Sequence, residues 1–162
     1  HAVGLLPTTT LAVGAALRMV NLNALGFNSD EAVYAGQAAS LAGNPHYVGM
    51  FPVFRAHPML VQSLLSVFFR TGEHDVVGRV VIAALGVVTL FLVYLLGAEL
   101  YSRYVGVLAA AILAVMPYHV VVTRQVLLDG PMVLCATLTL LFVTKFAKTG
   151  PSSVSNVLSP AR

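Results

Sequence analysis

Long apolar stretches alternate with short polar segments along the chain. Val80–Ala98 and Tyr104–Val122 each contain 19 residues without a charge, and Gly130–Thr144 contains 15, which Lys145 can extend by snorkelling. A helix needs about 20 apolar residues to cross the hydrocarbon core of a bilayer. Together with an apolar N-terminal stretch, the pattern predicts four transmembrane helices. We expect them at about residues 4–25, 76–98, 104–122 and 130–147.

A long polar segment, about residues 26–75, separates the first two predicted spans and contains four of the six acidic residues. Ser29 or Asp30 is a suitable N-cap for a helix that runs to about Ala42 and ends at Gly43-Asn44-Pro45. The same segment then contains a second, more apolar stretch.

That stretch, Pro58–Phe69, is too short to cross a bilayer and is flanked by Arg55 and Arg70. We therefore expect an interfacial helix that lies along the membrane surface. The predicted fold is an all-α integral membrane protein with about four transmembrane helices and interfacial helices in a long first external loop. Residues 149–162 are rich in Ser and Pro and are expected to form a tail or linker.

The number of spans decides which loops share a side of the membrane. With two spans between them, Asp30 and Asp129 face the same side. Arg103, Lys145 and Lys148 then share the opposite side, which the positive-inside rule assigns to the cytoplasm. We therefore expect a multi-pass protein of the cytoplasmic (plasma) membrane, with both acidic loops on the external face.

Composition agrees with the membrane class and excludes several functions. Hydrophobic residues make up 58% of the 162-residue chain and charged residues 9%, whereas soluble domains carry about 25% charged residues. The net charge of +3 is too small and too dispersed for nucleic-acid binding. The chain contains no Walker A, dinucleotide-binding, esterase or HExxH motif and only one cysteine, Cys135, so no cofactor is expected.

An acidic pair, Asp30-Glu31, follows the first predicted span. Neighbouring helix positions diverge by about 100°, so one carboxylate can act as a general base while the other holds a substrate hydroxyl or a basic partner. The structural alternative is that the pair begins a helix, because acids favour the positive end of the helix dipole. The two interpretations are compatible, and the residues alone leave both open.

A second polar loop, Thr123–Asp129, lies between the third and fourth predicted spans. Its Arg124 carries a planar guanidinium suited to phosphate or carboxylate, and its Asp129 directly precedes a predicted helix start. The alternative is that both residues only mark the water interface.

Two further residues are candidates for substrate binding. His57 can orient an acid or contact a phosphate, but its spacing from His46 and His74 matches no metal-binding motif, so no metal site is expected. Arg79 lies one turn inside the second predicted span, where a charge indicates function unless the side chain reaches the interface.

The order of these motifs resembles that of one enzyme family. The sequence runs through Phe27-Asn28-Ser29-Asp30-Glu31, His57-Pro58-Met59-Leu60, Gly78-Arg79, Gly106–Pro117 and Arg124-Gln125-Val126-Leu127-Leu128-Asp129. From about Leu17 to Lys148 it resembles the N-terminal part of the protein O-mannosyltransferase and aminoarabinose-transferase group. These are multispanning GT-C glycosyltransferases of the glycosyltransferase 39 family.

The resemblance implies an inverting, mannosyltransferase-like enzyme that moves a sugar from a polyprenyl-phosphate-sugar donor to an acceptor hydroxyl on a protein, lipid or glycan. Asp30 would be the general base and Glu31 would position acceptor or donor. Arg124 and Asp129 would line the same cavity, and His57 and Arg79 are expected to bind substrate with them. A donor anchored in membrane lipid also explains why no nucleotide-binding motif is needed.

The sequence departs from the family's pattern in two ways. Met59 follows His-Pro where family members often continue Pro-Leu, which leaves the acceptor class open, and the family's enzymes are several times longer. We therefore expect this chain to be an N-terminal fragment of a larger enzyme.

The alternatives are a transporter or flippase module and a non-catalytic membrane subunit. Transporters tend to have broken helices and polar residues at mid-membrane, whereas the charges here lie at span ends, which favours the enzyme.

Overall fold

The protein is described by a computed structural model that covers residues 2–24, 26–51, 58–70 and 75–149. Every regular element in these ranges is a helix, and the chain is an all-α membrane protein, as the sequence predicts. The helices are α1 (Ala2–Met19), α2 (Ser29–Leu41), α3 (Pro45–Val48), α4 (Leu60–Phe69), α5 (Asp75–Leu100), α6 (Arg103–Val115), α7 (Pro117–Val122) and α8 (Asp129–Thr149).

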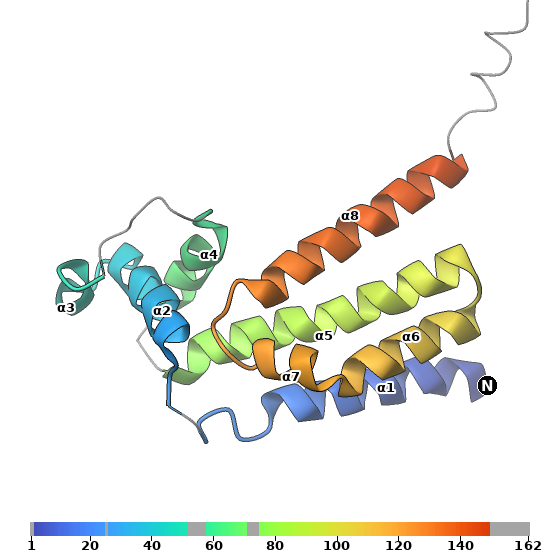
Figure 1. Cartoon of the computed structure of the whole chain (residues 1–162), viewed down its shortest axis with the longest axis horizontal. Coiled ribbons are helices and arrows are strands. Elements are labelled where there is room, and N and C mark those ends of the chain that lie inside the picture. The colour runs from blue at the N-terminus through green and yellow to red at the C-terminus, as the bar shows by residue number, and fades with distance from the viewer. Residues whose placement is uncertain (1, 25, 52–57, 71–74, 150–162) are drawn as a thin grey trace, which may run out of the picture.

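The long helix α5 is the centre of an elongated bundle. It packs against α1, α6 and α8, which run along its length (Figure 1). Two of the described helices are long and apolar enough to cross a membrane: α5 over Val76–Leu100 and α8 over Asp129–Lys148. The predicted second and fourth spans correspond to these two helices.

The other two predicted spans have a different form. The first helix, α1, ends at Met19, before the predicted boundary near residue 25. The predicted span over 104–122 is divided into α6 and α7, because Met116 adopts an extended conformation (ψ 116°) and Pro117 starts a new helix. Proline has no N–H and favours an extended residue before it, so the helix cannot continue through this point. An arrangement of four transmembrane spans remains a prediction.

The turn between α5 and α6 brings two glycines into contact. A Cβ on Gly106 would lie 2.4 Å from the carbonyl oxygen of Tyr94, and a Cβ on Gly97 would lie 2.7 Å from the Cα of Gly106. The Ser102 side chain caps α6 by accepting from the backbone N–H of Val105 at 3.3 Å. Helices inside a membrane gain little from burying apolar surface, so close backbone approach through small residues is a main source of their packing energy.

A module of three helices, α2, α3 and α4, packs at the start of α5 (Figure 1). The side chain of Asn28, not Ser29 or Asp30, caps α2: its Oδ1 accepts from the backbone N–H of Glu31 at 2.8 Å. The expected cap was therefore placed one or two residues too late, because Ser29 and Asp30 already belong to the first helical turn. The helix ends as predicted, with Gly43 in the left-handed region (φ 91°).

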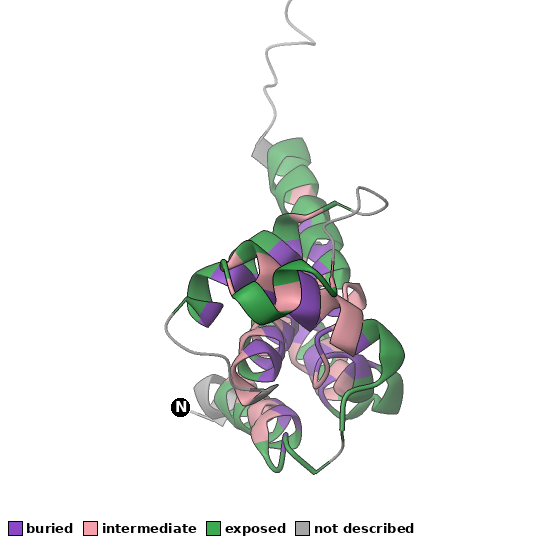
Figure 2. Ribbon diagram, turned by 90° about the vertical axis from the view of Figure 1, so that its left-hand side faces the viewer, coloured by how far each residue is buried: buried purple, intermediate pink, exposed green. Residues whose placement is uncertain are grey.

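The core of this module joins it to the bundle. Its buried residues come from α2, α4, α5 and the loop after α7, and are Ala35, Ala38, Ala39, Val61, Leu65, Phe69, Ile82 and Val126. Figure 2 looks onto this end of the molecule, with the buried stretches of the helices in purple. The loop that contains Val126 is therefore held in the module's core.

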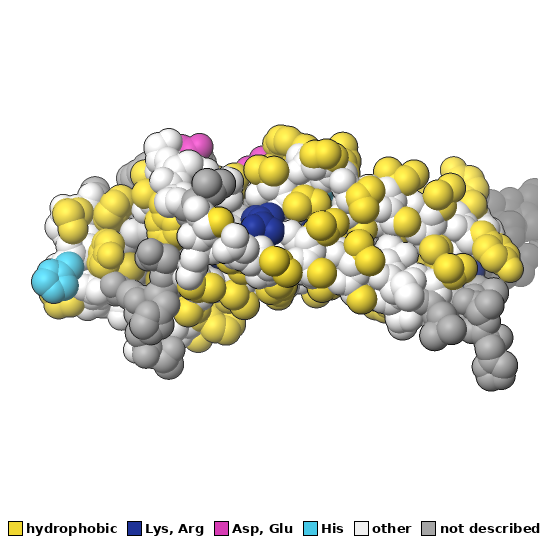
Figure 3. All heavy atoms as spheres, turned by 90° about the horizontal axis from the view of Figure 1, so that it is seen from below, with side chains coloured by type: hydrophobic (Ala, Val, Ile, Leu, Met, Phe, Trp, Pro, Cys, Tyr) yellow, Lys and Arg dark blue, Asp and Glu magenta, His cyan; other side chains and the backbone are white. Residues whose placement is uncertain are grey.

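The outward face of α4 is also apolar. Leu60, Leu64, Val67 and Phe68 are exposed on it. The predicted helix over residues 58–69 is present as Leu60–Phe69. A helix with one apolar face in a core and another exposed is suited to the boundary of a bilayer, and its place at the membrane surface remains a prediction. Figure 3 shows hydrophobic side chains distributed along the whole length of one face of the molecule.

The two ends of the bundle carry different features. The helical module, the end of α1 and the loop between α7 and α8 lie at one end, whereas the α5–α6 turn and the end of α8 lie at the other (Figure 1). At the second end Lys148 forms an exposed ion pair with Glu99 at 3.2 Å. The polar loops singled out in the sequence meet at the first end.

The glycine contact between α5 and α6 can be tested with a single methyl group. Gly106→Ala places a Cβ against the backbone of α5, and we expect it to destabilise the bundle by about 1–3 kcal/mol, the usual cost of overpacking. Thermal melting of the detergent-solubilised protein measures the effect. Gly49→Ala, whose new Cβ would meet nothing within 4 Å, is the matched control. Equal melting temperatures for the two variants would contradict the contact.

Candidate functional site

A buried ion pair joins α2 to α5. The guanidinium of Arg79 donates to both carboxylate oxygens of Glu31, from Nε to Oε1 and from Nη2 to Oε2, each at 2.7 Å. The two side chains are 4% and 1% exposed. Such a two-pronged geometry satisfies both groups at once, which a buried pair requires if its charges are to be tolerated.

Arg79 also holds the connection between α1 and α2. Its Nη1 donates to the carbonyl of Leu22 at 2.6 Å and its Nη2 to the carbonyl of Gly26 at 3.1 Å. The ring of Phe27 lies against the guanidinium, 4.7 Å from its central carbon to the ring centroid, in a cation–π contact. One arginine of α5 therefore fixes the chain on both sides of residue 25.

Glu31 reaches a third part of the chain. Its Oε1 accepts from the backbone N–H of Val126 at 2.9 Å, in the loop between α7 and α8. Beside it, the amide of Asn28 donates to the side-chain oxygen of Gln125 at 2.8 Å. These bonds hold the start of α2 against the loop of residues 123–128.

Arg124 in that loop has a different environment. Its Nη1 donates to the carbonyl of Leu17 at 2.5 Å and its Nη2 to the carbonyl of Asn21 at 3.2 Å, at the end of α1. Among the described residues no carboxylate lies within ion-pair distance of Arg124, so its charge is met only by carbonyl dipoles.

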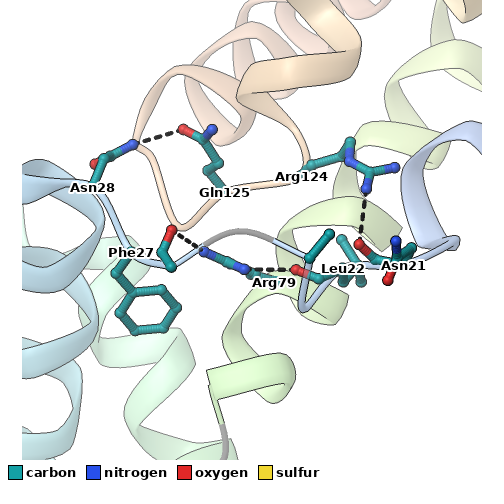
Figure 4. A pocket seen from close by; sticks show the side chains of 9 residues that line it. Asn21, Leu22, Phe27, Asn28, Arg79, Arg124 and Gln125 are labelled. Carbon is teal, nitrogen blue, oxygen red and sulfur yellow. Dashed lines mark hydrogen bonds between the residues drawn. The ribbon is translucent and has the colours of Figure 1, made fainter.

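The two arginines line one pocket, with a volume of about 420 Å³. The other lining residues come from the connection after α1 and from the two loops just described, and are Asn21, Leu22, Ala24, Gly26, Phe27, Asn28 and Gln125. Figure 4 shows Arg79 and Arg124 entering this pocket from two elements, with Asn28 and Gln125 bonded across it. The volume lies in the range of small-molecule sites. Since Glu31 matches the charge of Arg79, Arg124 gives the pocket its net positive charge.

Several predicted site residues lie outside this pocket. Asp30 is exposed in the first turn of α2, and Asp129 is half-buried as the first residue of α8. Neither forms an ion pair with a described residue. His57 lies outside the described residues. The structure thus brings together Glu31, Arg79 and Arg124, and leaves the carboxylate of Asp30 available to solvent two positions after the pocket residue Asn28.

Sequence reasoning missed the amide residues of the site. Gln125 directly follows Arg124 and Asn28 stands two positions before Asp30, but their contact spans 97 positions and no periodicity signals it. It also treated Arg79 and Glu31 as separate candidates, although a charge one turn inside a span requires a partner. Within the described ranges no three His, Cys, Asp or Glu side chains come close enough together to hold a metal ion.

Fold and site together define a membrane protein with an arginine-lined pocket at one end of a helical bundle. Residues 56–155 match the sequence model of the dolichyl-phosphate-mannose-protein mannosyltransferase family. Because the match covers well over half of the 162 residues, the chain belongs to this family, a group of membrane glycosyltransferases of the GT-C type. Searches among curated proteins and among solved structures found no match.

The region that matches the family model contains some of the candidate site residues and not others. It includes Arg79, Arg124 and Asp129, and it begins after Asp30 and Glu31. The family assignment therefore does not depend on the acidic pair.

The buried ion pair leads to a prediction about stability. Glu31→Gln removes one charge and leaves Arg79 buried without its counterion, which typically costs about 3–5 kcal/mol. We expect a large fall in melting temperature and in the amount of folded protein in the membrane. Asp30→Asn, the same change of charge on the exposed neighbour, should alter stability by less than about 0.5 kcal/mol.

A double variant provides a further check on the same pair. Replacing Glu31 and Arg79 together by Met removes both charges, and we expect it to recover part of the stability lost in Glu31→Gln. If Glu31→Gln and Asp30→Asn melt at the same temperature, the ion pair does not have the structural role described.

Proposed function

We propose that this protein transfers a sugar from a polyprenyl-phosphate-sugar donor to an acceptor hydroxyl, with inversion at the anomeric carbon. The pocket that contains Arg124, in a chain of this mannosyltransferase family, is the observation that carries the proposal. The family's name gives dolichyl-phosphate-mannose as donor and protein as acceptor. For this chain we propose the same chemical classes, a lipid-linked phosphate sugar and a hydroxyl group.

Arg124 is suited to the donor's phosphate. Two of its N–H groups are used by the carbonyls of Leu17 and Asn21, and its remaining donors have no partner among the described residues. Negative charge develops on the phosphate oxygen as its bond to the anomeric carbon breaks. A guanidinium held in place before the reaction stabilises that charge without having to reorganise. Arg79 adds to the local potential, but its own donors are occupied.

Asp30 is suited to be the general base. It is exposed in the first turn of α2, two residues after Asn28, which lines the pocket. In the proposed reaction its carboxylate takes the proton of the acceptor hydroxyl while the hydroxyl oxygen attacks the anomeric carbon. The bond to the phosphate then breaks, and polyprenyl phosphate leaves. Asp129 and His57 are proposed to complete the substrate site.

Glu31 has a positioning role in this scheme. Three of the roughly four lone-pair positions of its carboxylate accept from Arg79 and from the backbone of Val126, and its side chain is only 1% exposed, so an acceptor hydroxyl in solvent does not reach it. It holds the start of α2, which carries Asp30, against the loop that carries Arg124. The base and the phosphate-binding group are thereby kept at a fixed separation.

The proposed location is the external face of the cytoplasmic membrane, in a multi-pass arrangement. All the proposed site residues that the structure describes lie at one end of the bundle, and Arg103, Lys145 and Lys148 belong to helix segments at the other end (Figure 1). Arg70, Arg79 and Arg124 lie at the polar end, but Arg79 is paired with Glu31 and Arg124 is assigned to the donor phosphate. The three basic residues of the other end therefore favour a cytoplasmic assignment for it. Both polar loops would then face outward.

The role of Asp30 is tested by turnover. We expect Asp30→Asn in full-length protein in membranes to reduce consumption of a polyprenyl-phosphate sugar by about 10²–10⁴-fold, the usual contribution of a general base, at normal protein levels. Mass spectrometry of the donor pool measures the rate. Ser29→Ala, on the same exposed turn, is the control. Equal turnover by Asp30→Asn and wild type would show that Asp30 only begins the helix.

The role of Arg124 is tested by donor affinity. We expect Arg124→Met to raise the donor KM at least about tenfold, equivalent to 1.4 kcal/mol, because the phosphate loses its charged partner. Initial rates over a range of donor concentrations separate KM from kcat. Arg103→Met removes an exposed arginine at the other end of the bundle and should leave KM unchanged. An unaltered KM in Arg124→Met would exclude the proposed phosphate contact.

A further inference from the structure

The break between α6 and α7 exposes backbone carbonyls inside the bundle. Leu113 and Ala114 lie in the last turn of α6, where carbonyls have no donor from their own helix. Pro117, four residues after Leu113, has no N–H to offer. Ala114 is 1% exposed, so water does not reach these groups freely. Another donor must satisfy them.

Arg18 of α1 supplies that donor. Its side chain is fully buried (0% exposed), and its Nη1 donates to the carbonyl of Ala114 at 3.0 Å and to that of Gly14 at 2.9 Å. Its Nη2 donates to the carbonyl of Leu113 at 3.3 Å and lies 2.7 Å from Nδ1 of His119. Within the described chain no carboxylate pairs with Arg18. Its charge therefore rests on the negative end of the α6 dipole and on the imidazole of His119.

An arginine in the loop after α7 donates in turn to a backbone carbonyl at the end of α1. His119 lies in α7, and its carbonyl accepts from the hydroxyl of Thr123 at 2.6 Å. The next residue, Arg124, donates to the carbonyl of Leu17, the residue before Arg18. An arginine of α1 thus caps the end of α6, and an arginine after α7 caps the end of α1. Arg18 thus holds α1 to the end of α6 and to α7, and Arg124 holds the loop after α7 to the end of α1; we call these two contacts the reciprocal clamp.

We propose that Arg18 is a positioning residue that holds Arg124 in the pocket by fixing α1 to the break between α6 and α7. Arg18 does not line the pocket, so it acts through the carbonyl contacts and not on a ligand. If the Arg18 side of this reciprocal clamp is lost, α7 is released from α1, and the loop is held only by Arg124 to the end of α1 and by Gln125 and Val126 to the start of α2. Arg124 then moves more freely opposite Arg79. This inference rests on the proposed function in one respect only, namely that the ligand bound by Arg124 is the donor's phosphate.

The first test needs no ligand. The single cysteine, Cys135, is replaced by Ala, and a reporter cysteine is placed at the half-buried Leu127 of the loop or at the half-buried Ala98 of the opposite end. Maleimide labelling rates are measured in detergent for the full-length protein. We expect Arg18→Met to raise the rate at position 127 several-fold and to leave the rate at 98 unchanged.

Two further variants keep this test decisive. Arg103→Met, an exposed arginine, should change neither labelling rate. Arg18→Lys retains the buried charge but not the planar fork, so it should raise the rate at position 127 as well, and it replaces Arg18→Met if that protein does not accumulate. An unchanged rate at 127 overturns the positioning role. An equal rise at both reporter positions also overturns it, because Arg18 would then stabilise the whole bundle.

The second test links the clamp to the donor site through binding of polyprenyl phosphate, measured by native mass spectrometry. We expect Arg18→Met and Arg124→Met to weaken binding by similar factors, and the double variant to bind no more weakly than Arg124→Met alone. Losses that multiply would show that Arg18 does not act through Arg124. If wild type binds no polyprenyl phosphate, the proposed donor is wrong, while the labelling rates still decide whether Arg18 positions the loop.

Discussion

The Glu31–Arg79 pair is the interaction on which the polar end of this bundle depends. A carboxylate and a guanidinium removed from water are tolerated only when nearly every oxygen and N–H finds a partner. Here those partners are the carbonyls of Leu22 and Gly26 and the backbone N–H of Val126. Satisfying one ion pair therefore ties α1, α2, α5 and the 123–128 loop to a common point. The ion pair can be buried only if these carbonyls and this N–H lie close to it. Leu22, Gly26 and Arg79 also line the pocket, so the contacts that satisfy the pair also shape the pocket.

The hydrophobic pattern predicts the helices well because length and the absence of charge are local properties. The spans around α5 and α8, and a helix over Leu60–Phe69, follow from them directly. Contacts between distant residues are not local. A charge such as Arg79 predicts that some partner exists, but nothing in the spacing identifies Glu31, 48 positions earlier. The predicted span over 104–122 ran through Pro117, although proline favours a break, and nothing in the sequence indicates that Arg18 pairs with the carbonyls that the break leaves. The cap of α2 was misplaced for a related reason, because Asn, Ser and Asp are adjacent and equally suited to the position.

The two arginines of the pocket show why burial matters when a charge is assigned a role. Arg79 stands one turn inside a predicted span, where a charge indicates function unless the side chain reaches the interface. In the fold its charge is matched by Glu31, so it contributes mainly to architecture. Arg124 lies in a loop, where an arginine often marks only the water interface. Its charge has no acidic partner among the described residues, and it lines the pocket. The net positive charge available to an anion therefore comes from the loop residue.

The break between α6 and α7 also bears on the choice between an enzyme and a transporter. Broken helices in transporters leave unwound carbonyls and helix ends facing a central site, where they bind the cargo. In this chain the carbonyls at the break, those of Leu113 and Ala114, point to Arg18 of a neighbouring helix. They are occupied by the protein itself and do not line the pocket that contains Arg124. Carbonyls that are already paired within the protein are not offered to a cargo in the way that those of a transporter are. It sets the direction of α7, and with it the place where the loop delivers Arg124.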